Sequence, residues 1–255
     1  MTESSNQISI FGVRVDSYTL DDLIINLRSI IQARKKAVVS NVNIQALNLV
    51  YNDQRLKNFF NNSDIVFCDG FGVQLGARLL GFSPPERNTP PDWIGQLFQV
   101  CVSQQYKVFF LGSKLGVAEK AANLSMAKYP GLNIVGIHHG YFDKTQNSAE
   151  NNGVIAKINS MSPDVLIVGF GMPMQEFWIE ENFKDLNATL FLPVGALFDY
   201  LAGEVYRVPR WMTDHGFEWL GRLVIEPRRL WKRYILGIPL FFFRIMKERS
   251  KNKKV

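Results

Sequence analysis

Short apolar runs and amphipathic stretches alternate along most of this chain. The apolar runs are about four to six residues long, and each is followed by a segment in which apolar residues recur every three or four positions. Strands buried in a parallel sheet are apolar on both faces, whereas the helices that connect them are apolar on one. The pattern therefore predicts an α/β fold, with a mainly parallel sheet that carries helices on both faces, as in Rossmann-like proteins.

The predicted elements cover residues 8–195. An alternating run at residues 8–17 predicts an edge hairpin. Buried strands are predicted at residues 37–40, 64–69, 107–112, 132–140, 164–171 and 189–195. Helices are predicted at residues 19–36, 44–60, 72–81, 92–105, 115–130, 151–163 and 174–186.

The charges are distributed unevenly between the two ends of the chain. Residues 203–255 contain 13 Lys or Arg and 5 Asp or Glu, whereas residues 1–202 contain 16 and 18. We therefore predict an α/β catalytic domain over residues 1–202 and a basic, aromatic-rich, helical appendage over residues 203–255.

The appendage combines its cations with aromatic residues, among them Trp231, Tyr234 and the Phe241–Phe243 cluster. A helix with cations on one side and aromatic residues on the other is typical of the membrane interface. We expect peripheral attachment to an anionic membrane, because the chain has no apolar stretch of about 18 residues that could span a bilayer. Packing in a homo-oligomer is the alternative use of these aromatic residues. Nucleic acid is not an expected partner, because the rest of the chain has no basic excess.

Several function classes are disfavoured by the residues that are missing. "GSKLG" at residues 112–116 is neither a dinucleotide-binding GxGxxG motif nor a P-loop. The three histidines include His138 and His139, which we expect to point to opposite faces of a strand, so no metal site is predicted. The sequence also has no Asp-x-Asp. Cys68 and Cys101 lie in apolar surroundings and the N-terminus shows no signal peptide pattern, so we expect a cytoplasmic protein.

Polar residues or glycines follow each predicted buried strand. In parallel α/β sheets, ligands bind beyond the carboxyl ends of the strands, so these positions are candidate site residues. Taken singly, each is equally consistent with a helix cap or a turn. Gly112 and Gly116 open a helix where backbone amides could approach a phosphate. The candidates of this kind are Asn41, Asn43, Asp69, Gly112, Ser113, Gln175, Glu176 and Asp199.

Asp69 is the candidate of greatest interest. It follows the apolar run Ile65–Cys68 and precedes Gly70-Phe71-Gly72, where the glycines leave room for a ligand to lie against the backbone. A carboxylate at such a position could remove the proton from an attacking hydroxyl. The alternative is that Asp69 only caps the helix that follows.

Several longer motifs identify a resemblance to a known family. In order along residues 8–235, the chain closely resembles the WecG/TagA/CpsF glycosyltransferase family. The motifs that carry it are "SNVN" at residue 40, "DGFGVQ" at 69, "RNTPPDW" at 87, "FFLGSKLGVAEKAA" at 109, "PDVLIVGFGMPMQEFWI" at 163, "VGALFDYLAG" at 194 and "RVPRWMTDHGFEWLGRLVIEPRRLWKRY" at 207.

The resemblance implies an activity. Members of this family transfer a sugar, typically N-acetylmannosamine or its uronic acid, from a UDP-sugar to a polyprenyl-diphosphate-linked sugar at the cytoplasmic membrane face. They invert the anomeric configuration and require no metal or other cofactor. The resemblance therefore predicts a UDP-sugar donor, a lipid-linked acceptor and a position on the inner face of the cell membrane.

The resemblance also assigns roles to residues. It makes Asp69 the catalytic base and places Asn43 at a matching catalytic position, whereas Asn41 stands where the family has threonine. Arg87, Gln175 and Asp199 match polar pocket positions. It further implies that the arginine-rich appendage folds over the site. Substrate contacts are therefore expected from Arg222, Arg228 and Arg229.

Two other functions compete with this hypothesis. One is a catalytically silent subunit that binds a UDP-sugar or acts as a scaffold in a polysaccharide assembly complex. The other is a nucleotide-sugar epimerase or dehydrogenase, which would require the GxGxxG motif that the chain lacks.

Overall fold

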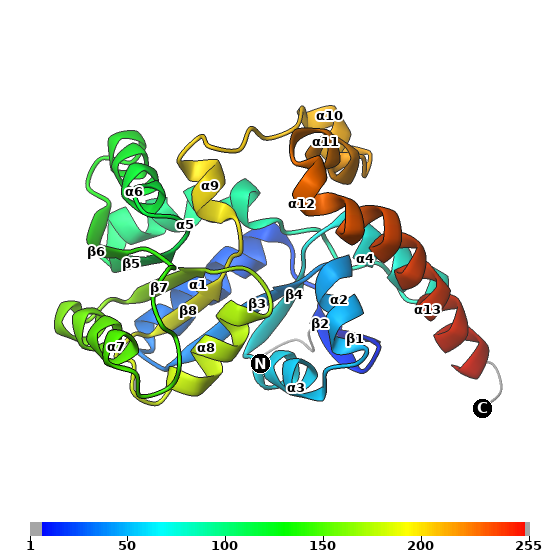
Figure 1. Ribbon diagram of the computed structural model, residues 1–255, viewed down its shortest axis with the longest axis horizontal. Helices are drawn as coiled ribbons and strands as arrows, with labels where there is room; N and C mark the ends of the chain where they lie inside the picture. The colour runs from blue at the N-terminus through cyan, green and yellow to red at the C-terminus, as the bar shows by residue number, and fades with distance from the viewer. Residues whose placement is uncertain (1–6, 253–255) are drawn as a thin grey trace.

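The computed structural model describes residues 7–252 and has an eight-stranded sheet at its centre (Figure 1). The strand order is β1-β2-β4-β3-β8-β7-β5-β6, in which β1 and β2 pair antiparallel and every other pair is parallel. The predicted mainly parallel sheet, with its edge hairpin, is confirmed. The strands are β1 Gln7–Ile10, β2 Val13–Asp16, β3 Ala37–Val42, β4 Ile65–Cys68, β5 Lys107–Gly112, β6 Asn133–His138, β7 Val165–Gly169 and β8 Leu190–Pro193.

Helices cover both faces of this sheet, as predicted (Figure 1). Alternate residues of a strand point to opposite faces, so Phe109 and Phe110 of β5 enter different cores. One core includes residues of α1 Leu20–Gln32, α5 Pro90–Gln104, α6 Val117–Lys128 and α9 Leu197–Leu201. The other includes residues of α2 Ile44–Val50, α3 Gln54–Asn62, α4 Phe71–Leu80, α7 Ala149–Met161, α8 Met174–Asn182 and α13 Gly237–Asn252.

The single helix predicted over residues 44–60 is wrong, because the structure has two helices there. α2 ends at Val50, and Asp53 begins α3 by accepting a hydrogen bond from the backbone of Leu56 (3.0 Å). Asn and Asp side chains bind nearby backbone groups and so favour caps over helix interiors. The break lets α2 and α3 follow the same face of the sheet in different directions.

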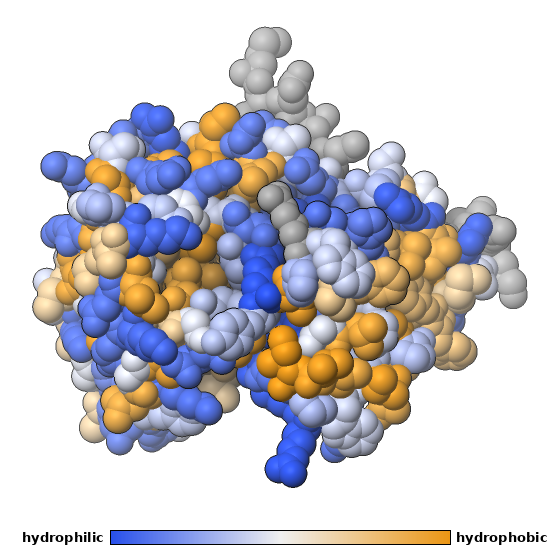
Figure 2. Space-filling model, turned by 90° about the horizontal axis from the view of Figure 1, so that it is seen from above, coloured by the Kyte–Doolittle hydropathy of each residue, from blue (hydrophilic) through white to orange (hydrophobic). Residues whose placement is uncertain are grey.

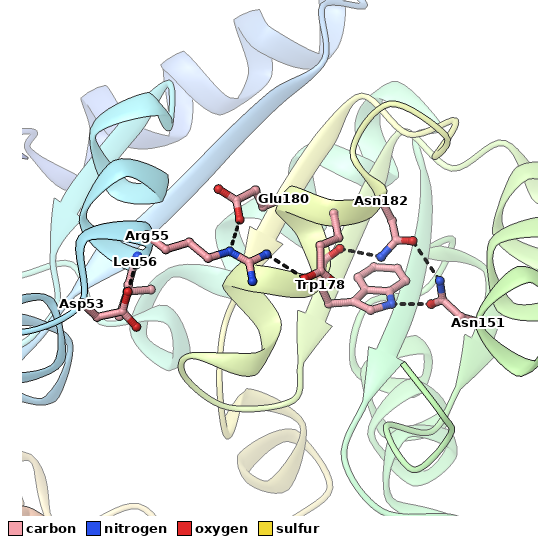
Figure 3. Close-up of polar contacts among 8 residues, drawn as sticks. Asp53, Arg55, Leu56, Asn151, Trp178, Glu180 and Asn182 are labelled. Carbon is pink, nitrogen blue, oxygen red and sulfur yellow. Dashed lines mark hydrogen bonds and ion pairs between the residues drawn. The ribbon is translucent and has the colours of Figure 1, made fainter. Parts of the chain in front are cut away.

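A network of polar side chains fixes α8 between α3 and α7 (Figure 3). Arg55 of α3 donates a hydrogen bond to Glu180 of α8 (2.6 Å). On the other side, the indole nitrogen of Trp178 donates to Asn151 of α7 (2.7 Å), and Asn151 donates to Asn182 (2.9 Å). The Trp178 and Asn182 contacts are buried, where unmade hydrogen bonds are costly. They fix the position of the N-terminus of α8 at the carboxyl edge of the sheet.

The basic C-terminal region is helical and lies above one end of the sheet (Figure 1). It contains α10 Arg210–Asp214, α11 Glu218–Ile225, α12 Pro227–Trp231, the π-helical η1 Lys232–Leu236 and α13. Among residues 7–252, no helix is both long and apolar enough to cross a membrane.

The last helix, α13, is part of the folded core. Phe241 is fully buried, with its ring centroid 5.8 Å from that of Phe11 in the β1–β2 turn. Phe243 is 68% exposed, and Phe242 is partly buried. The expectation that Phe241–Phe243 form one outward-facing cluster is therefore wrong for Phe241. Consecutive residues of a helix are about 100° apart, so three phenylalanines in a row cannot all lie on one face of the helix.

Candidate active site

A cavity of about 830 Å³ opens at the carboxyl ends of β3, β4, β5, β7 and β8. β3 and β8 are neighbours, but α2 and α9, which follow them, pack on opposite faces of the sheet. Ligands of open α/β sheets bind at such a switch point. Residues of α11, α12 and η1 line the cavity on the side away from the sheet.

Asp69 lies in this cavity, directly after β4. The side-chain nitrogen of Asn43 donates to Oδ2 of Asp69 (3.3 Å). Asn43 is also the N-cap of α2, where its Oδ1 accepts a hydrogen bond from the backbone of Ala46 (3.1 Å). This second bond orients the amide so that its NH₂ group faces the carboxylate. Asn43 and Asp69, which the sequence analysis named separately as candidates, are thus in contact.

The helix-cap explanation of Asp69 does not fit the geometry. The N-cap of α4 is Gly70, and no side chain makes a capping hydrogen bond there. The backbone nitrogen of Asp69 donates to Val42 of β3 (2.8 Å), which continues the strand pairing past the end of β4. The carboxylate is thus free to face the cavity.

The surroundings of Asp69 favour a base whose pKa is higher than usual. Burial raises the pKa of the carboxyl group. This rise in the pKa is opposed by the Asn43 amide and by the cations Arg233 and Arg222. The hydroxyl of Thr89 opposes it as well, although it lies close without hydrogen-bonding geometry. A carboxylate with a raised pKa holds a removed proton more firmly, which suits a general base.

The opposite end of the cavity contains Ser113 and Asp199. The hydroxyl of Ser113, after β5, donates to Oδ1 of Asp199 in α9 (2.6 Å). Ser113 and Asp199 therefore form one polar group. The preceding Gly112 has a separate role, because it lets β5 and β7 end close together. A Cβ on Gly112 would lie 2.4 Å from the carbonyl oxygen of Gly169, and its φ is +146°.

Gln175 and Glu176 lie together, but only Gln175 lines the cavity. Oε1 of Gln175 accepts hydrogen bonds from the backbone of Gly171 (3.1 Å) and Gly195 (3.0 Å), and Nε2 donates to Glu176 (2.8 Å). Glu176 is buried behind it, and burial raises the pKa of its carboxyl group to about 7. Gln175 thus joins the loops after β7 and β8.

Asn41 and Arg87 are both held by other protein groups. Asn41 lines the cavity, but its side-chain nitrogen donates to the carbonyl oxygen of Pro193, which ties the end of β3 to β8 (2.9 Å). Arg87 is not among the cavity residues and forms ion pairs with Asp92 (3.6 Å) and Glu218 (3.3 Å). Asn41 therefore lies at the cavity, as predicted for a site residue, whereas the Arg87 side chain faces Glu218 and Asp92.

The arginines of the appendage differ in position. Arg222 and Arg229 line the cavity, whereas Arg228 is exposed outside it. Nε of Arg222 is buried without a hydrogen-bond partner, and Arg229 pairs with Glu226 (2.6 Å).

Sequence reasoning missed four further charged residues of the cavity. Arg233 follows Arg229 by four positions, a spacing that places two residues on one helical side and could have revealed it. Glu218 comes from α11, and Lys114 and Lys144 come from the loops after β5 and β6. Burial lowers the pKa of Lys144, whose ammonium group lies between the rings of Phe142 (4.5 Å) and Phe170 (4.7 Å).

The two adjacent histidines do not point apart as expected. β6 ends at His138, so strand alternation no longer applies to His139, and their ring centroids are 4.6 Å apart. Within residues 7–252, no group of three or more His, Cys, Asp or Glu side chains could hold a metal ion.

The chain is similar over nearly its whole length to known glycosyltransferases. Two relatives are named "N-acetylglucosaminyldiphosphoundecaprenol N-acetyl-beta-D-mannosaminyltransferase" and come from Staphylococcus aureus strains NCTC 8325 / PS 47 and MW2. They are 27% and 26% identical over 256 residues, which cover 99% of this chain and 98% of each relative. The family model described as "Glycosyl transferase WecG/TagA/CpsF family" matches residues 8–255. The chain therefore belongs to the WecG/TagA/CpsF glycosyltransferase family, as its motifs predicted.

Proposed function

We propose that this enzyme transfers N-acetylmannosamine from a UDP-sugar to N-acetylglucosamine on a polyprenyl diphosphate, with inversion at the anomeric carbon. The names of the two Staphylococcus aureus relatives support this sugar and this acceptor. The observation that carries the proposal is the Asn43–Asp69 pair, which faces a cavity whose other side is lined by arginines.

The reaction assigns one role to each side of the cavity. Asp69 takes the proton from the acceptor hydroxyl while that oxygen attacks the anomeric carbon of the donor. The bond from the anomeric carbon to the phosphate oxygen breaks, and UDP leaves with the electron pair. Arg222 and Arg233 then face the new negative charge on the diphosphate, where guanidinium groups can donate in pairs to phosphate oxygens. Asp69 afterwards loses the proton to solvent.

The same side chains allow the reaction to proceed without a metal. Arg222, Arg229 and Arg233 line the cavity, and Lys114 and Lys144 add cationic groups from the sheet side. A divalent cation would serve to neutralise the same diphosphate charge. We therefore propose that these side chains replace it.

We also propose that the enzyme binds the inner face of the cell membrane peripherally. Apolar side chains gather on the right half of the surface in Figure 2, above the C-terminal helices. The exposed apolar residues of these helices are Trp211, Phe217, Leu220, Val224, Ile225, Trp231, Ile235, Leu236, Leu240, Phe243 and Met246. A basic and apolar surface is attracted to anionic lipid. It would place the cavity near an acceptor whose lipid remains in the bilayer.

The Asp69→Asn variant tests the catalytic proposal. We expect turnover to fall roughly 10²–10⁴-fold, the usual contribution of a general base, while UDP binding and the circular dichroism spectrum remain unchanged. Product would be identified by mass after incubation with UDP-N-acetylmannosamine and a short-chain acceptor. Asp21→Asn, on the exposed side of α1, is the matched control and should retain full activity.

Two results would decide against the proposal. Full activity of Asp69→Asn would show that another group is the base. UDP-sugar binding by the unaltered protein without product from any donor would favour the silent scaffold subunit instead.

A further inference from the structure

The roof of the cavity includes one helix, α11, that has no buried residue. The roof consists of residues 203–236, which include α10, α11, α12 and η1. α11 has no buried residue, and its close helix neighbours are α10 and α12, which belong to the same segment. Polar contacts must therefore contribute much of what holds α11 in place.

Four charged side chains join the roof to the body of the protein. Glu218 of α11 lies 3.3 Å from Arg87, and Arg87 lies 3.6 Å from Asp92 at the start of α5. Asp92 in turn lies 2.6 Å from Arg207 of the roof. Negative and positive groups alternate through this four-charge bridge, and two of its members come from each side.

The ion pair of the bridge that reaches α11 is partly shielded from solvent. The side chains of Arg87 and Glu218 are 18% and 24% exposed. Ion pairs in such partly buried positions are screened by salt less than surface pairs, and loss of one partner leaves the other charge uncompensated. The bridge can therefore hold the roof more firmly than fully exposed ion pairs would.

Arg87 is itself fixed beside the catalytic strand. Its backbone bridges Cys68, the last residue of β4, and the backbone nitrogen of Asn88 donates to Cys68 (2.9 Å). The side chain of Asn88 donates to the carbonyl oxygen of Tyr18 (2.9 Å), which anchors the same segment from the other side. Cys68 directly precedes Asp69. The bridge therefore links the roof to the backbone that positions the base.

Glu218 needs a cation in this place. It lines the cavity together with Asp69, and the two carboxylates interact unfavourably. Arg207, Arg222 and Arg87 offset this repulsion. Without Arg87, Glu218 would lose its ion-pair partner across the bridge, and the roof would lose one of its links to the body of the protein.

We propose that Arg87 is a positioning residue, which holds Glu218 and thereby keeps residues 203–236 closed over Asp69. This role differs from the substrate contact that family resemblance suggests for Arg87. The proposal rests on the proposed transferase function only where activity is measured, since closure of the roof can be followed without substrate.

Charge reversal provides the test. Hydrogen–deuterium exchange of residues 203–236 would be measured by mass spectrometry in Arg87→Glu, Glu218→Arg and the double variant. We expect exchange on the order of 10-fold faster in each single variant and partly restored protection in the double variant, in which the new carboxylate still lies beside Asp92. Reversal of the exposed Arg55–Glu180 pair (Figure 3) is the matched control and should leave exchange in the roof unchanged.

Kinetics separates positioning from phosphate binding. We expect Arg87→Glu to raise KM for both substrates and to lower kcat, and the double variant to recover part of both. If Arg87 instead bound phosphate, Arg87→Glu would lose activity while the roof remained protected, and Glu218→Arg would not rescue it. That result would overturn the proposal.

A milder variant covers the case in which charge reversal prevents folding. Arg87→Gln keeps the size and polarity of the side chain but removes the charge. Unchanged exchange of residues 203–236 in a folded Arg87→Gln protein would also overturn the proposal. Because exchange is measured without substrate, failure of the transferase assay alone would count against the proposed function and not against the bridge.

Discussion

Replacing Phe241 by alanine tests whether the last helix belongs to the core. The Phe241 side chain is fully buried and packs against Phe11 and Phe242, with ring centroids 5.8 and 5.2 Å away. Gly76 of α4 lies so close that a Cβ there would be 2.7 Å from the ring of Phe241. The ring thus fills a site that is closely packed on several sides.

The expected cost follows from this packing. Truncation of a buried phenylalanine to alanine typically costs about 3–5 kcal/mol, because transfer energy is lost and a cavity remains. Loss of aromatic pairs adds to this figure where the pairs have edge-to-face geometry, as both do here. A domain of ordinary stability has only about 5–15 kcal/mol, so Phe241→Ala should lower the urea midpoint substantially.

Phe243→Ala is the matched control within the same helix. Phe243 is 68% exposed, so we expect the free energy of unfolding to change by about 0.5 kcal/mol or less. Its loss should instead weaken binding to anionic vesicles by roughly 10-fold, the value of one apolar side chain moved out of the bilayer interface. Circular dichroism in urea and vesicle co-sedimentation would measure the two effects.

The reasoning fails if the two variants behave alike. A Phe241→Ala cost below about 1 kcal/mol would mean that α13 does not pack as described. The same packing means that deletion of residues 237–255 would expose the core. Such a truncation cannot serve as a test of membrane anchoring alone.

Three further predictions concern the site. The folded-state pKa of Glu176, about 7 against a usual 4.5, means that the folded protein keeps a proton which the unfolded chain releases. The free energy of unfolding should therefore fall by up to about 3 kcal/mol as pH rises from 4 to 8. Glu176→Gln should remove this pH dependence and should be more stable than the unaltered protein at pH 8, as measured by urea titration. Arg222→Ala should lower turnover on a water-soluble acceptor roughly 10- to 150-fold, whereas Arg228→Ala should not; equal effects would refute the placement of the diphosphate. Transfer should persist in EDTA, and activity that is lost on chelation and restored by Mg²⁺ or Mn²⁺ would show that a metal neutralises the diphosphate.

The sequence was sufficient to locate the elements and part of the site. Strand ends can be recognised from apolar runs, and parallel strands bring their carboxyl ends to one edge. Asn43, Asp69, Ser113 and Asp199 could therefore be named as candidates from the sequence, and the structure pairs Asn43 with Asp69 and Ser113 with Asp199. The strand order, by contrast, depends on which helices cross which face, and apolar patterns do not contain that information.

The contacts of several candidate residues could not be predicted from the sequence. Whether a polar side chain faces a cavity depends on what else it can bond, and those partners come from distant parts of the chain. Asn41 is occupied by Pro193, Arg87 by Glu218, and Glu176 by its neighbour Gln175. From the sequence, Phe241 was expected to contact the membrane. Its partner Phe11 is 230 positions away, so the sequence pattern gave no sign that the ring is buried.

The contact between Phe11 and the last helix also has a consequence for biosynthesis. The ring of Phe11 meets Phe241, and its backbone nitrogen donates to the carboxylate of Glu248 (3.2 Å). The β1–β2 hairpin is translated well before α13, the helix that supplies both contacts. Until α13 has been made, the β1–β2 turn therefore lacks these partners, although other helices of the same face are already present. A copy that stops before the roof arginines would also lack one side of the cavity, so we expect it to be inactive.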